Sequence, residues 1–213
     1  MTERRPTVHV VDDDDSVRTG IVRLLQAAGF EARGYASAGE FLLGRPLPDA
    51  PGCAVLDVRM PGPSGLDLQE ALARLGTPLP VVFLTGHGDI AMSVRAMKAG
   101  AVDFLTKPVS RDALLHAVRT ALARDAETRA AREGSRMLRA RYEALTLRER
   151  EVFAGIVAGK LNKQIAVELG TAERTIKAHR AHLMQKLQAG SVADLVHMAD
   201  QLAAAPLGKP VRL

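Results

Sequence analysis

The first half of the chain alternates between short apolar runs and longer stretches in which apolar residues recur at helical spacing. Runs of four or five mainly apolar residues are typical of buried strands, whereas a spacing of three or four is typical of amphipathic helices. The predicted strands are Val8–Val11, the weaker Glu31–Tyr35, Cys53–Leu56, Val81–Leu84 and Val102–Thr106. The predicted helices between them are Ser16–Ala28, Ala38–Leu43, Leu66–Leu75 and Ile90–Ala99, and a proline-containing loop is predicted at 44–52. This order predicts an α/β fold, a doubly wound five-stranded parallel sheet with helices on both faces.

The second half of the chain is predicted to be helical throughout. From Ser110 to Leu145 the only helix breaker in the sequence is Gly134, so this segment is either one long helix or two that meet at Gly134. Its first part carries an apolar stripe that we expect to pack on the sheet, and its polar remainder is predicted to link two domains. The later helices are predicted at Arg148–Ala158, at Lys163–Leu169, from an N-cap at Thr171 to Leu187, and at Val192–Ala205, followed by a tail at Pro206–Leu213.

Composition and charge narrow the classes of function. Of the 213 residues 47% are hydrophobic, enough for the cores of two modest domains. There is no run of roughly 18 apolar residues and no secretory signal, and the single cysteine, Cys53, fits a reducing compartment, so we expect a cytoplasmic protein without a membrane partner. Residues 1–123 hold 13 Lys and Arg against 14 Asp and Glu, whereas residues 124–213 hold 16 against 10, which suggests a polyanionic partner for the second part.

The ends of the predicted strands carry the candidate chemistry. Asp12 and Asp13 follow the first strand, Asp57 the third and Lys107 the fifth, and Thr85 follows the fourth. Because sites in open parallel sheets lie beyond the carboxyl ends of the strands, we expect these side chains to meet. A carboxylate there can attack phosphorus to give an acyl phosphate, with cationic help because both reactants are anions.

A divalent metal would complete such a site. Magnesium prefers oxygen ligands, and Asp12 and Asp13 are placed to hold it beside Asp57, with Lys107 and the Thr85 hydroxyl on other phosphoryl oxygens. Taken singly, an acid at a strand end is usually a solvated loop residue, and the run of four Asp residues alone is also explained by a helix N-terminus, where negative charge is favoured. Their order along five βα units is the more specific signal.

These residues, together with the segments 56–61, 85–89 and 99–108, resemble the receiver domain of two-component response regulators, of the FixJ and StyR type, over about residues 6–122. The resemblance implies a domain at 1–123 in which a sensor histidine kinase phosphorylates Asp57. It also implies that the Arg59 backbone carbonyl joins Asp12, Asp13 and Asp57 around Mg²⁺. Thr85 and Phe104 would be switch residues, and Lys107 would contact the phosphate. Pro63 departs from the family pattern, which often has methionine there.

The helix predicted from Thr171 has an apolar side at Ile176, Leu183 and Leu187 and a largely basic opposite side. With the preceding helix and a short glycine-containing turn it forms a helix-turn-helix pattern, whose second helix enters the major groove of DNA. A basic helix face that is merely solvated is the alternative. The candidate base readers are Arg174, Lys177 and Ala178; Lys163, Thr171 and Arg180 are candidate backbone contacts, and His182 flanks the polar side.

The segments 145–152, 162–166 and 175–179 resemble the LuxR-type helix-turn-helix domain, over about residues 143–205. The resemblance implies a transcription regulator rather than an enzyme. It would bind double-stranded promoter DNA as a homodimer, formed when the protein is phosphorylated, with RNA polymerase as a further candidate partner. Residues 124–142 would then be a helical linker and residues 206–213 a tail.

Two other classes compete with this reading. A phosphohydrolase of the haloacid-dehalogenase kind also uses an aspartate at a strand end, and Asp12 with Asp14 has the required spacing of two, but Asp57 and the C-terminal helices would then have no role. A ligand-gated regulator of the quorum-sensing kind would share the DNA-binding end but would not need acids at the strand ends.

Overall fold

The structure is a computed structural model that describes residues 5–44, 50–75, 79–86 and 90–204. The chain divides into two compact units, residues 1–129 and 130–213. The strands are β1 (Thr7–Val11), β2 (Glu31–Tyr35), β3 (Gly52–Leu56), β4 (Val81–Thr85) and β5 (Asp103–Thr106). The helices are α1 (Asp15–Ala27), α2 (Ala38–Leu43), α3 (Gly65–Arg74), α4 (Ile90–Lys98), α5 (Arg111–Glu143), α6 (Leu147–Val157), α7 (Asn162–Glu168), α8 (Glu173–Leu187) and α9 (Val192–Ala204).

The first unit is built on a five-stranded sheet in the order β2-β1-β3-β4-β5, and every pair of neighbouring strands is parallel. This confirms the predicted fold class. The strand order reverses between β1 and β3, and at such a switch point the carboxyl ends of the strands leave room for a site. The register places Val11 beside Leu56 and Thr85 beside Thr106, so the residues that follow these strands emerge at one edge.

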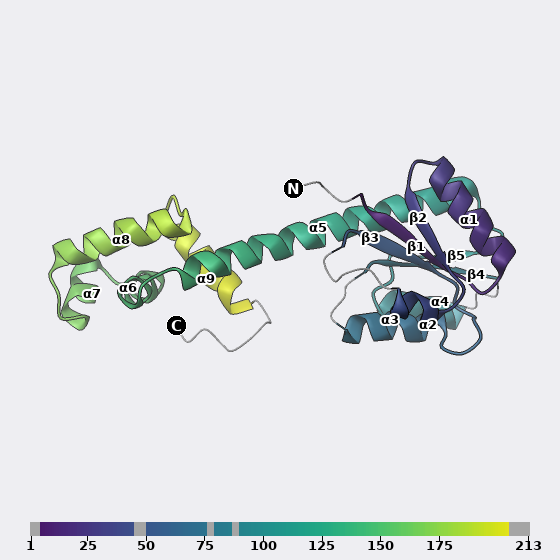
Figure 1. The fold of residues 1–213 in the computed structure, drawn as a ribbon. Helices are drawn as coiled ribbons and strands as arrows, with labels where there is room; N and C mark the ends of the chain where they lie inside the picture. Colours follow the sequence, from purple (N-terminus) through teal and green to yellow (C-terminus); the bar gives the residue numbers. More distant parts are fainter. Residues whose placement is uncertain (1–4, 45–49, 76–78, 87–89, 205–213) are drawn as a thin grey trace. The chain divides into compact units, whose positions relative to one another are not determined.

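Helices cover both faces of the sheet (Figure 1). On one face α1 and α5 pack against a cluster that includes Val10, Val55 and Leu114, and on the other α2, α3 and α4 pack against a cluster around Phe41 and Phe83. The predicted stripe at the start of α5 does pack on the sheet. The inner strands β1, β3 and β4 are buried on both faces and are mainly apolar, as in other parallel sheets, whereas the edge strand β2 is largely exposed and β5 is half-buried.

Helix α5 runs through Gly134 without interruption, which decides between the two predicted forms of this segment. The range 124–142 that the sequence assigns to a linker contains residues of both units. Asp125 is buried in the first unit, whereas Leu138 and Tyr142 belong to the hydrophobic core of the second.

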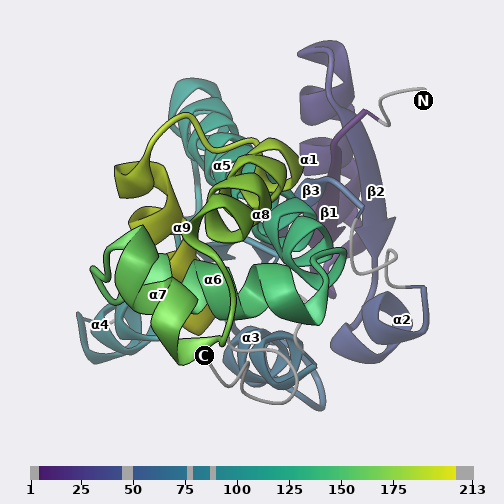
Figure 2. The ribbon, with the colours of Figure 1, turned by 90° about the vertical axis from the view of Figure 1, so that its left-hand side faces the viewer.

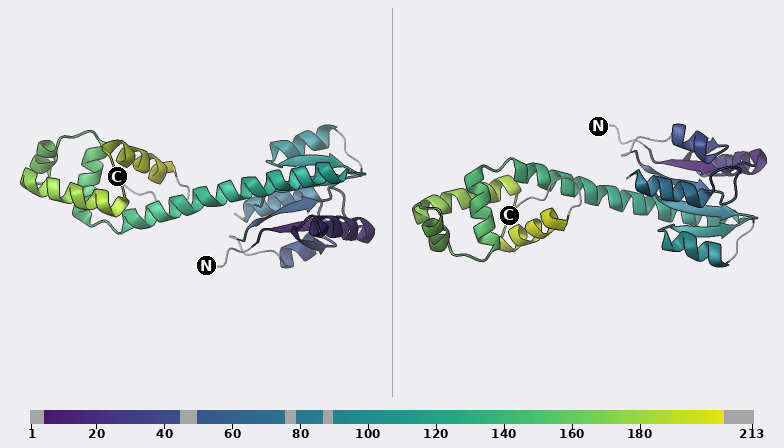
Figure 3. Two further views of the ribbon diagram at one scale, coloured as in Figure 1. Left: turned by 90° about the horizontal axis from the view of Figure 1, so that it is seen from above. Right: turned by 90° about the horizontal axis from the view of Figure 1, so that it is seen from below.

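The second unit consists of the end of α5 and helices α6 to α9 (Figures 2 and 3). Helix α8 packs against α6 and α7, and α9 packs against α6. The core of the second unit buries Ile176, Leu183 and Leu187, which confirms the predicted apolar side of α8. The N-cap prediction is wrong: Ala172 rather than Thr171 caps α8, and no side chain bonds there. The Thr171 amide instead donates to the Ala166 carbonyl at 2.9 Å, which makes Thr171 part of the turn.

Some predicted features lie outside the described residues: most of the loop at 44–52, the segment at 87–89 and the tail at 206–213. Among the helices that the structure describes, none is long and apolar enough to cross a membrane.

Candidate phosphoacceptor site and nucleic-acid interface

Four strand ends bring the predicted acids and the lysine together. Asp12 follows β1, Asp57 follows β3 and Lys107 follows β5, while Thr85 is the last residue of β4. The Lys107 Nζ lies 2.6 Å from Asp12 Oδ2 and 3.0 Å from Asp57 Oδ2. Residues up to 95 positions apart in the sequence therefore share one ion-paired cluster.

The two inner carboxylates are buried, and backbone groups orient them. Asp12 is 1% exposed and Asp57 8%. The Asp14 amide donates to Asp12 Oδ1 at 3.0 Å, and the Arg59 amide donates to Asp57 Oδ1 at 3.3 Å. Each carboxylate thus has one oxygen on a backbone N–H and the other on the ammonium, which fixes its orientation in the site.

The charges of this cluster depend on burial and pairing. Burial raises the pKa of Asp12, and the hydrogen bond and charge of Lys107 only partly offset that rise. For Lys107 burial acts to lower the pKa, but its hydrogen bonds to Asp12 and Asp57 outweigh burial, so its pKa is raised and it remains an ammonium ion. The site therefore keeps a cation beside the Asp57 carboxylate, where an incoming phosphoryl group would add negative charge.

The donor set fits a hard divalent cation. Asp12, Asp13 and Asp57 each offer a carboxylate oxygen, and the three oxygens lie within 4.8 Å of one another. Asp13 is exposed, which leaves the solvent side open. Magnesium takes oxygen ligands and keeps several waters, so three carboxylates with an open side suit it better than a closed cage would.

Two side chains extend the site toward α4. Thr85 is fully buried at the end of β4. Phe104, on β5, is half-buried and packs against the core on the α3–α4 side, with its ring centroid 6.1 Å from that of Phe83. Thr85 and Phe104 thus lie on adjacent strands, and Phe104 packs on the face of the sheet that α4 covers.

Sequence reasoning missed two residues that position the acids. Arg18 Nη1 donates to the Asp12 carbonyl at 2.7 Å and its other nitrogen pairs with Asp15, so one guanidinium holds the loop between β1 and α1. A Cβ at Gly65 would lie 2.2 Å from the Asp57 carbonyl oxygen, so only glycine lets α3 begin this close to the acceptor. Arg18 follows the run of four Asp residues, but an arginine near several acids is too common to be a sequence signal. Gly65 follows the prolines after Asp57 and gives a weak signal of a close backbone contact.

The geometry also bears on the phosphohydrolase reading. Asp14 is the N-cap of α1, and its Oδ1 accepts hydrogen bonds from the amides of Ser16 and Val17. Its carboxylate is therefore committed to the helix terminus, as is typical of an N-cap aspartate. That leaves Asp12 without the second acid that such a hydrolase places two residues after its nucleophile.

Lys163 is exposed on α7, and four other predicted DNA-contacting side chains recur at helical spacing on one exposed side of α8; together we call them the α7–α8 surface. The long side chains on it already have neighbours: Lys177 Nζ is 3.2 Å from Glu173, and Arg180 Nη1 donates to Asn162 at 3.3 Å. The exposed Lys177–Glu173 ion pair is weak and can exchange for a contact with DNA. The exposed residues are Lys163, Arg174, Lys177, Ala178 and His182, while Thr171 and Arg180 are half-buried.

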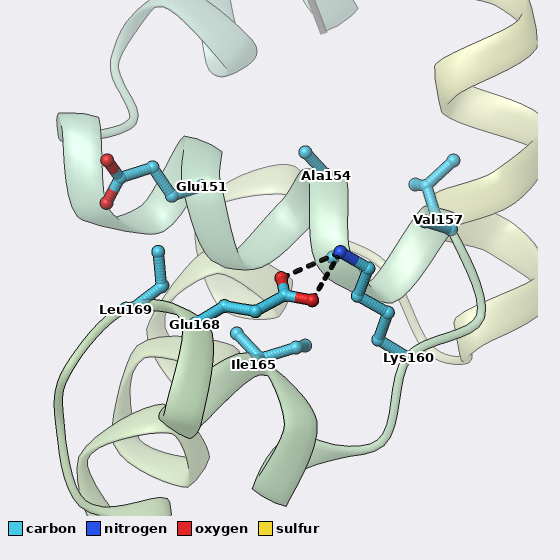
Figure 4. Close-up of a pocket in the computed structure, with 9 residues that line it drawn as sticks. Glu151, Ala154, Val157, Lys160, Ile165, Glu168 and Leu169 are labelled. Atoms are coloured by element: carbon cyan, nitrogen blue, oxygen red, sulfur yellow. Dashed lines mark hydrogen bonds and ion pairs between the residues drawn. The ribbon is translucent and has the colours of Figure 1, made fainter.

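Contacts across the second unit hold α8 in place. Glu149 is buried and forms a capping box with Thr146, and its Oε2 also accepts a 2.7 Å hydrogen bond from Lys186 in the last turn of α8. The pattern of a threonine followed three positions later by a glutamate could have revealed the capping box, but not Lys186. At the other end of α6, Lys160 pairs with both oxygens of Glu168 across the groove between α6 and α7 (Figure 4).

A parallel sheet with a carboxylate cluster at its switch point, joined to a helix-turn-helix unit, defines a class: a phosphoacceptor domain that controls a DNA-binding domain. Residues 8–119 match the family described as response regulator receiver domain, and residues 143–199 match the luxR family of bacterial regulatory proteins. The chain belongs to the response regulators, with a receiver domain and a LuxR-type DNA-binding domain.

Similar proteins of known name agree with this membership. The chain is 48% identical to nodulation protein W of Bradyrhizobium diazoefficiens, over 92% of this chain and 86% of that protein. It is 44% identical to the transcriptional regulatory protein FixJ of Azorhizobium caulinodans, over 97% of both. Among solved structures it is similar to the response regulator StyR, with a TM-score of 0.82 and 50% identity over 93% of this chain and all of that chain. The matched families are a receiver domain and regulatory proteins, and the FixJ relative is named a transcriptional regulatory protein, which bears out the predicted class of transcription regulator rather than enzyme. A receiver domain matches where a quorum-sensing regulator would have its ligand-binding domain.

Proposed function

We propose that this protein is switched by transfer of a phosphoryl group from a sensor histidine kinase to Asp57. The observation that carries the proposal is the buried Asp57 carboxylate, 3.0 Å from Lys107 Nζ and joined in one cluster by Asp12. In the transfer an Asp57 oxygen attacks phosphorus, the bond from phosphorus to the donor's imidazole nitrogen breaks, and an acyl phosphate forms.

Asp12, Asp13, Asp57 and the Arg59 carbonyl would hold the magnesium ion. When bound, the ion neutralises charge between the acceptor carboxylate and the phosphoryl oxygens. Lys107 supplies the second cation, and its ammonium contacts a phosphoryl oxygen as the pairing with Asp12 and Asp57 loosens. The receiver domain as a class binds Mg²⁺ through acidic residues, and the three carboxylates within 4.8 Å support this assignment here.

The switch would run through Thr85 and Phe104. A phosphoryl oxygen on Asp57 accepts a hydrogen bond from the Thr85 hydroxyl, and the resulting shift lets the Phe104 ring move inward. The exposed apolar residues of α4, namely Ile90 (84% exposed), Val94 (45%) and Met97 (46%), recur on one side of the helix and support a surface for a second copy. Dimerisation would bring two α7–α8 surfaces to adjacent half-sites of promoter DNA, about one helical turn apart.

On DNA, Arg174, Lys177 and Ala178 would contact base edges, while Lys163, Thr171 and Arg180 contact phosphates and His182 lies at the margin. RNA polymerase would be a further partner at the promoter. Promoter DNA as the target places the working protein in the cytoplasm, where a histidine kinase presents its phosphorylated domain.

Intact mass after incubation with acetyl phosphate tests the proposal. With Mg²⁺ the wild type is expected to gain one phosphoryl group, and Asp57→Asn is expected to gain none. Asp103→Asn, a half-buried acid on β5 outside the cluster, is the matched control and should be phosphorylated like the wild type. An adduct that persists in Asp57→Asn, or that forms fully in excess chelator, would refute the assignment.

A further inference from the structure

A buried carboxylate that the phosphoryl chemistry does not use lies on α5. Asp125 is 5% exposed, and its Oδ2 accepts a 3.0 Å hydrogen bond from the amide of Gly52. Gly52 is the first residue of β3, and Asp57 directly follows the last residue of the same strand. One short, fully buried strand therefore has the phosphoacceptor at one end and a side chain of α5 at the other.

The Gly52 end of β3 is tightly fitted. A Cβ on Gly52 would lie 2.3 Å from the Thr7 carbonyl oxygen, so the strand begins in close contact with β1. Arg129, one turn further along α5, places its Nε 3.9 Å from Asp125 Oδ2. A buried carboxylate is costly unless it is hydrogen-bonded, so the Gly52 amide and the carboxylate specify each other's position.

Asp125 is also the last buried residue of α5 in the first unit. It continues the buried stripe of Leu114, Val118 and Ala121 at helical spacing. Residues 126–137, all of which the structure describes, include no buried residue, and the next buried position is Leu138 in the core of the second unit. The receiver therefore holds α5 up to Asp125.

We infer that Asp125 is a positioning residue that ties α5 to the strand carrying the phosphoacceptor and so couples the state of the receiver to the DNA-binding domain. This inference rests on the proposed function, because it concerns how phosphorylation reaches the DNA-binding surface. The chemistry at Asp57 does not require Asp125, so its removal separates phosphorylation from output.

The coupling is measured on the full chain as an affinity ratio, which is the affinity for DNA with beryllofluoride and Mg²⁺ divided by the affinity without them. Four proteins are titrated with one DNA duplex, which is first selected from random sequences for binding to the wild type. They are the wild type, Asp125→Ala, Asp125→Asn and the control Glu127→Ala, which removes an exposed acid of the same helix. Each titration is run with and without beryllofluoride and Mg²⁺. We expect the affinity ratio to fall about threefold or more in Asp125→Ala, while Asp125→Asn, which keeps an acceptor for Gly52, retains most of it. Phosphorylation by acetyl phosphate is expected to stay within about twofold of wild type in all four. An affinity ratio in Asp125→Ala equal to that of the wild type, or a fall in Glu127→Ala as large as in Asp125→Ala, overturns the coupling.

Amide hydrogen exchange tests the anchor separately from the switch. In Asp125→Ala the Gly52 amide is expected to exchange about tenfold faster or more, while the Asp57 amide, bonded to the Val11 carbonyl at 2.8 Å, stays protected. An unchanged Gly52 amide overturns the anchor, and equal acceleration at Asp57 shows general destabilisation and overturns it too. If the DNA affinity of the wild type is the same with and without beryllofluoride, the proposed function fails, and the coupling role of Asp125 fails with it. The exchange rate of the Gly52 amide still decides whether α5 is anchored there.

Discussion

The receiver domain should lose stability between about pH 7 and about pH 5 because of one buried histidine. His9, on β1, is 3% exposed, and it packs against the rings of Tyr35 and Phe41. Its Nδ1 lies 3.1 Å from the Tyr35 hydroxyl, and its Nε2 has no hydrogen-bond partner among the described residues. Burial, reinforced by the charge of Arg33, lowers the pKa of His9 from 6.5 to about 4.

The sign and size of the effect follow from linkage. Between the folded pKa of about 4 and the unfolded pKa of 6.5, the unfolded chain binds a proton that the folded chain does not. The free energy of unfolding therefore rises with pH in this window and falls as the solution is acidified. From about pH 7 to about pH 5 the loss is about 2 kcal/mol, at about 1.4 kcal/mol for each unit within the window.

Urea unfolding, followed through the amide signals of β1, reports on this unit alone. The variant His9→Asn removes the titration while retaining a polar group for Tyr35, and it should lose about 2 kcal/mol less than wild type over the same pH range, whatever its stability at neutral pH. His116→Asn, at an exposed histidine on α5, is the control and should behave as wild type. If His9→Asn loses as much stability on acidification as wild type, His9 is not the group responsible and the reasoning is wrong.

Three further predictions concern the switch and the DNA-binding unit. Glu149→Ala should destabilise the second unit by about 2–3 kcal/mol, because the Thr146 amide and Lys186 lose a charged partner, whereas the exposed Glu151→Ala should cost little; urea unfolding of both variants decides. Lys177→Ala should weaken binding to specific duplexes more than to random ones, and Lys163→Ala should weaken both alike, which titrations across salt will distinguish; equal losses for Lys177→Ala would remove it from the base readers. Light scattering should show a larger mass for wild type with beryllofluoride but not for Thr85→Ala, and a Thr85→Ala protein that dimerises as readily would rule out the route through this hydroxyl.

The sheet could be predicted from sequence because its inner strands β1, β3 and β4 are buried on both faces and are therefore mainly apolar, whereas the exposed edge strand β2 gives only a weak signal. The cluster of Asp12, Asp57 and Lys107 followed from the same pattern, since the carboxyl ends of parallel strands meet at one edge of the sheet. Position alone does not assign chemistry, so the metal and switch roles of these residues remain predictions for the experiments above.

What the sequence could not predict depends on contacts between distant residues. Asp125 bonds to an amide 73 positions away, and Glu149 accepts from a lysine 37 positions away; no local pattern encodes either pairing. In the stripe of α5, an aspartate at a core-facing position was the one available hint. The N-cap at Thr171 was mispredicted because residue propensity favours threonine there, whereas the backbone bond of the turn shifts the cap to Ala172. Gly134 does not break α5, because its cost of about 1 kcal/mol is small beside the helix-favouring residues around it.

The central claim, that a phosphoryl group on Asp57 controls DNA binding by this chain, is tested most directly by one titration. Wild type and Asp57→Asn, each treated with acetyl phosphate and Mg²⁺ or left untreated, are titrated with the same selected duplex at fixed salt. We predict that treatment raises the affinity of wild type by about fivefold or more, the usual scale of coupling between two sites, and leaves Asp57→Asn unchanged. Equal affinities for treated and untreated wild type, or an equal gain in Asp57→Asn, would contradict the account.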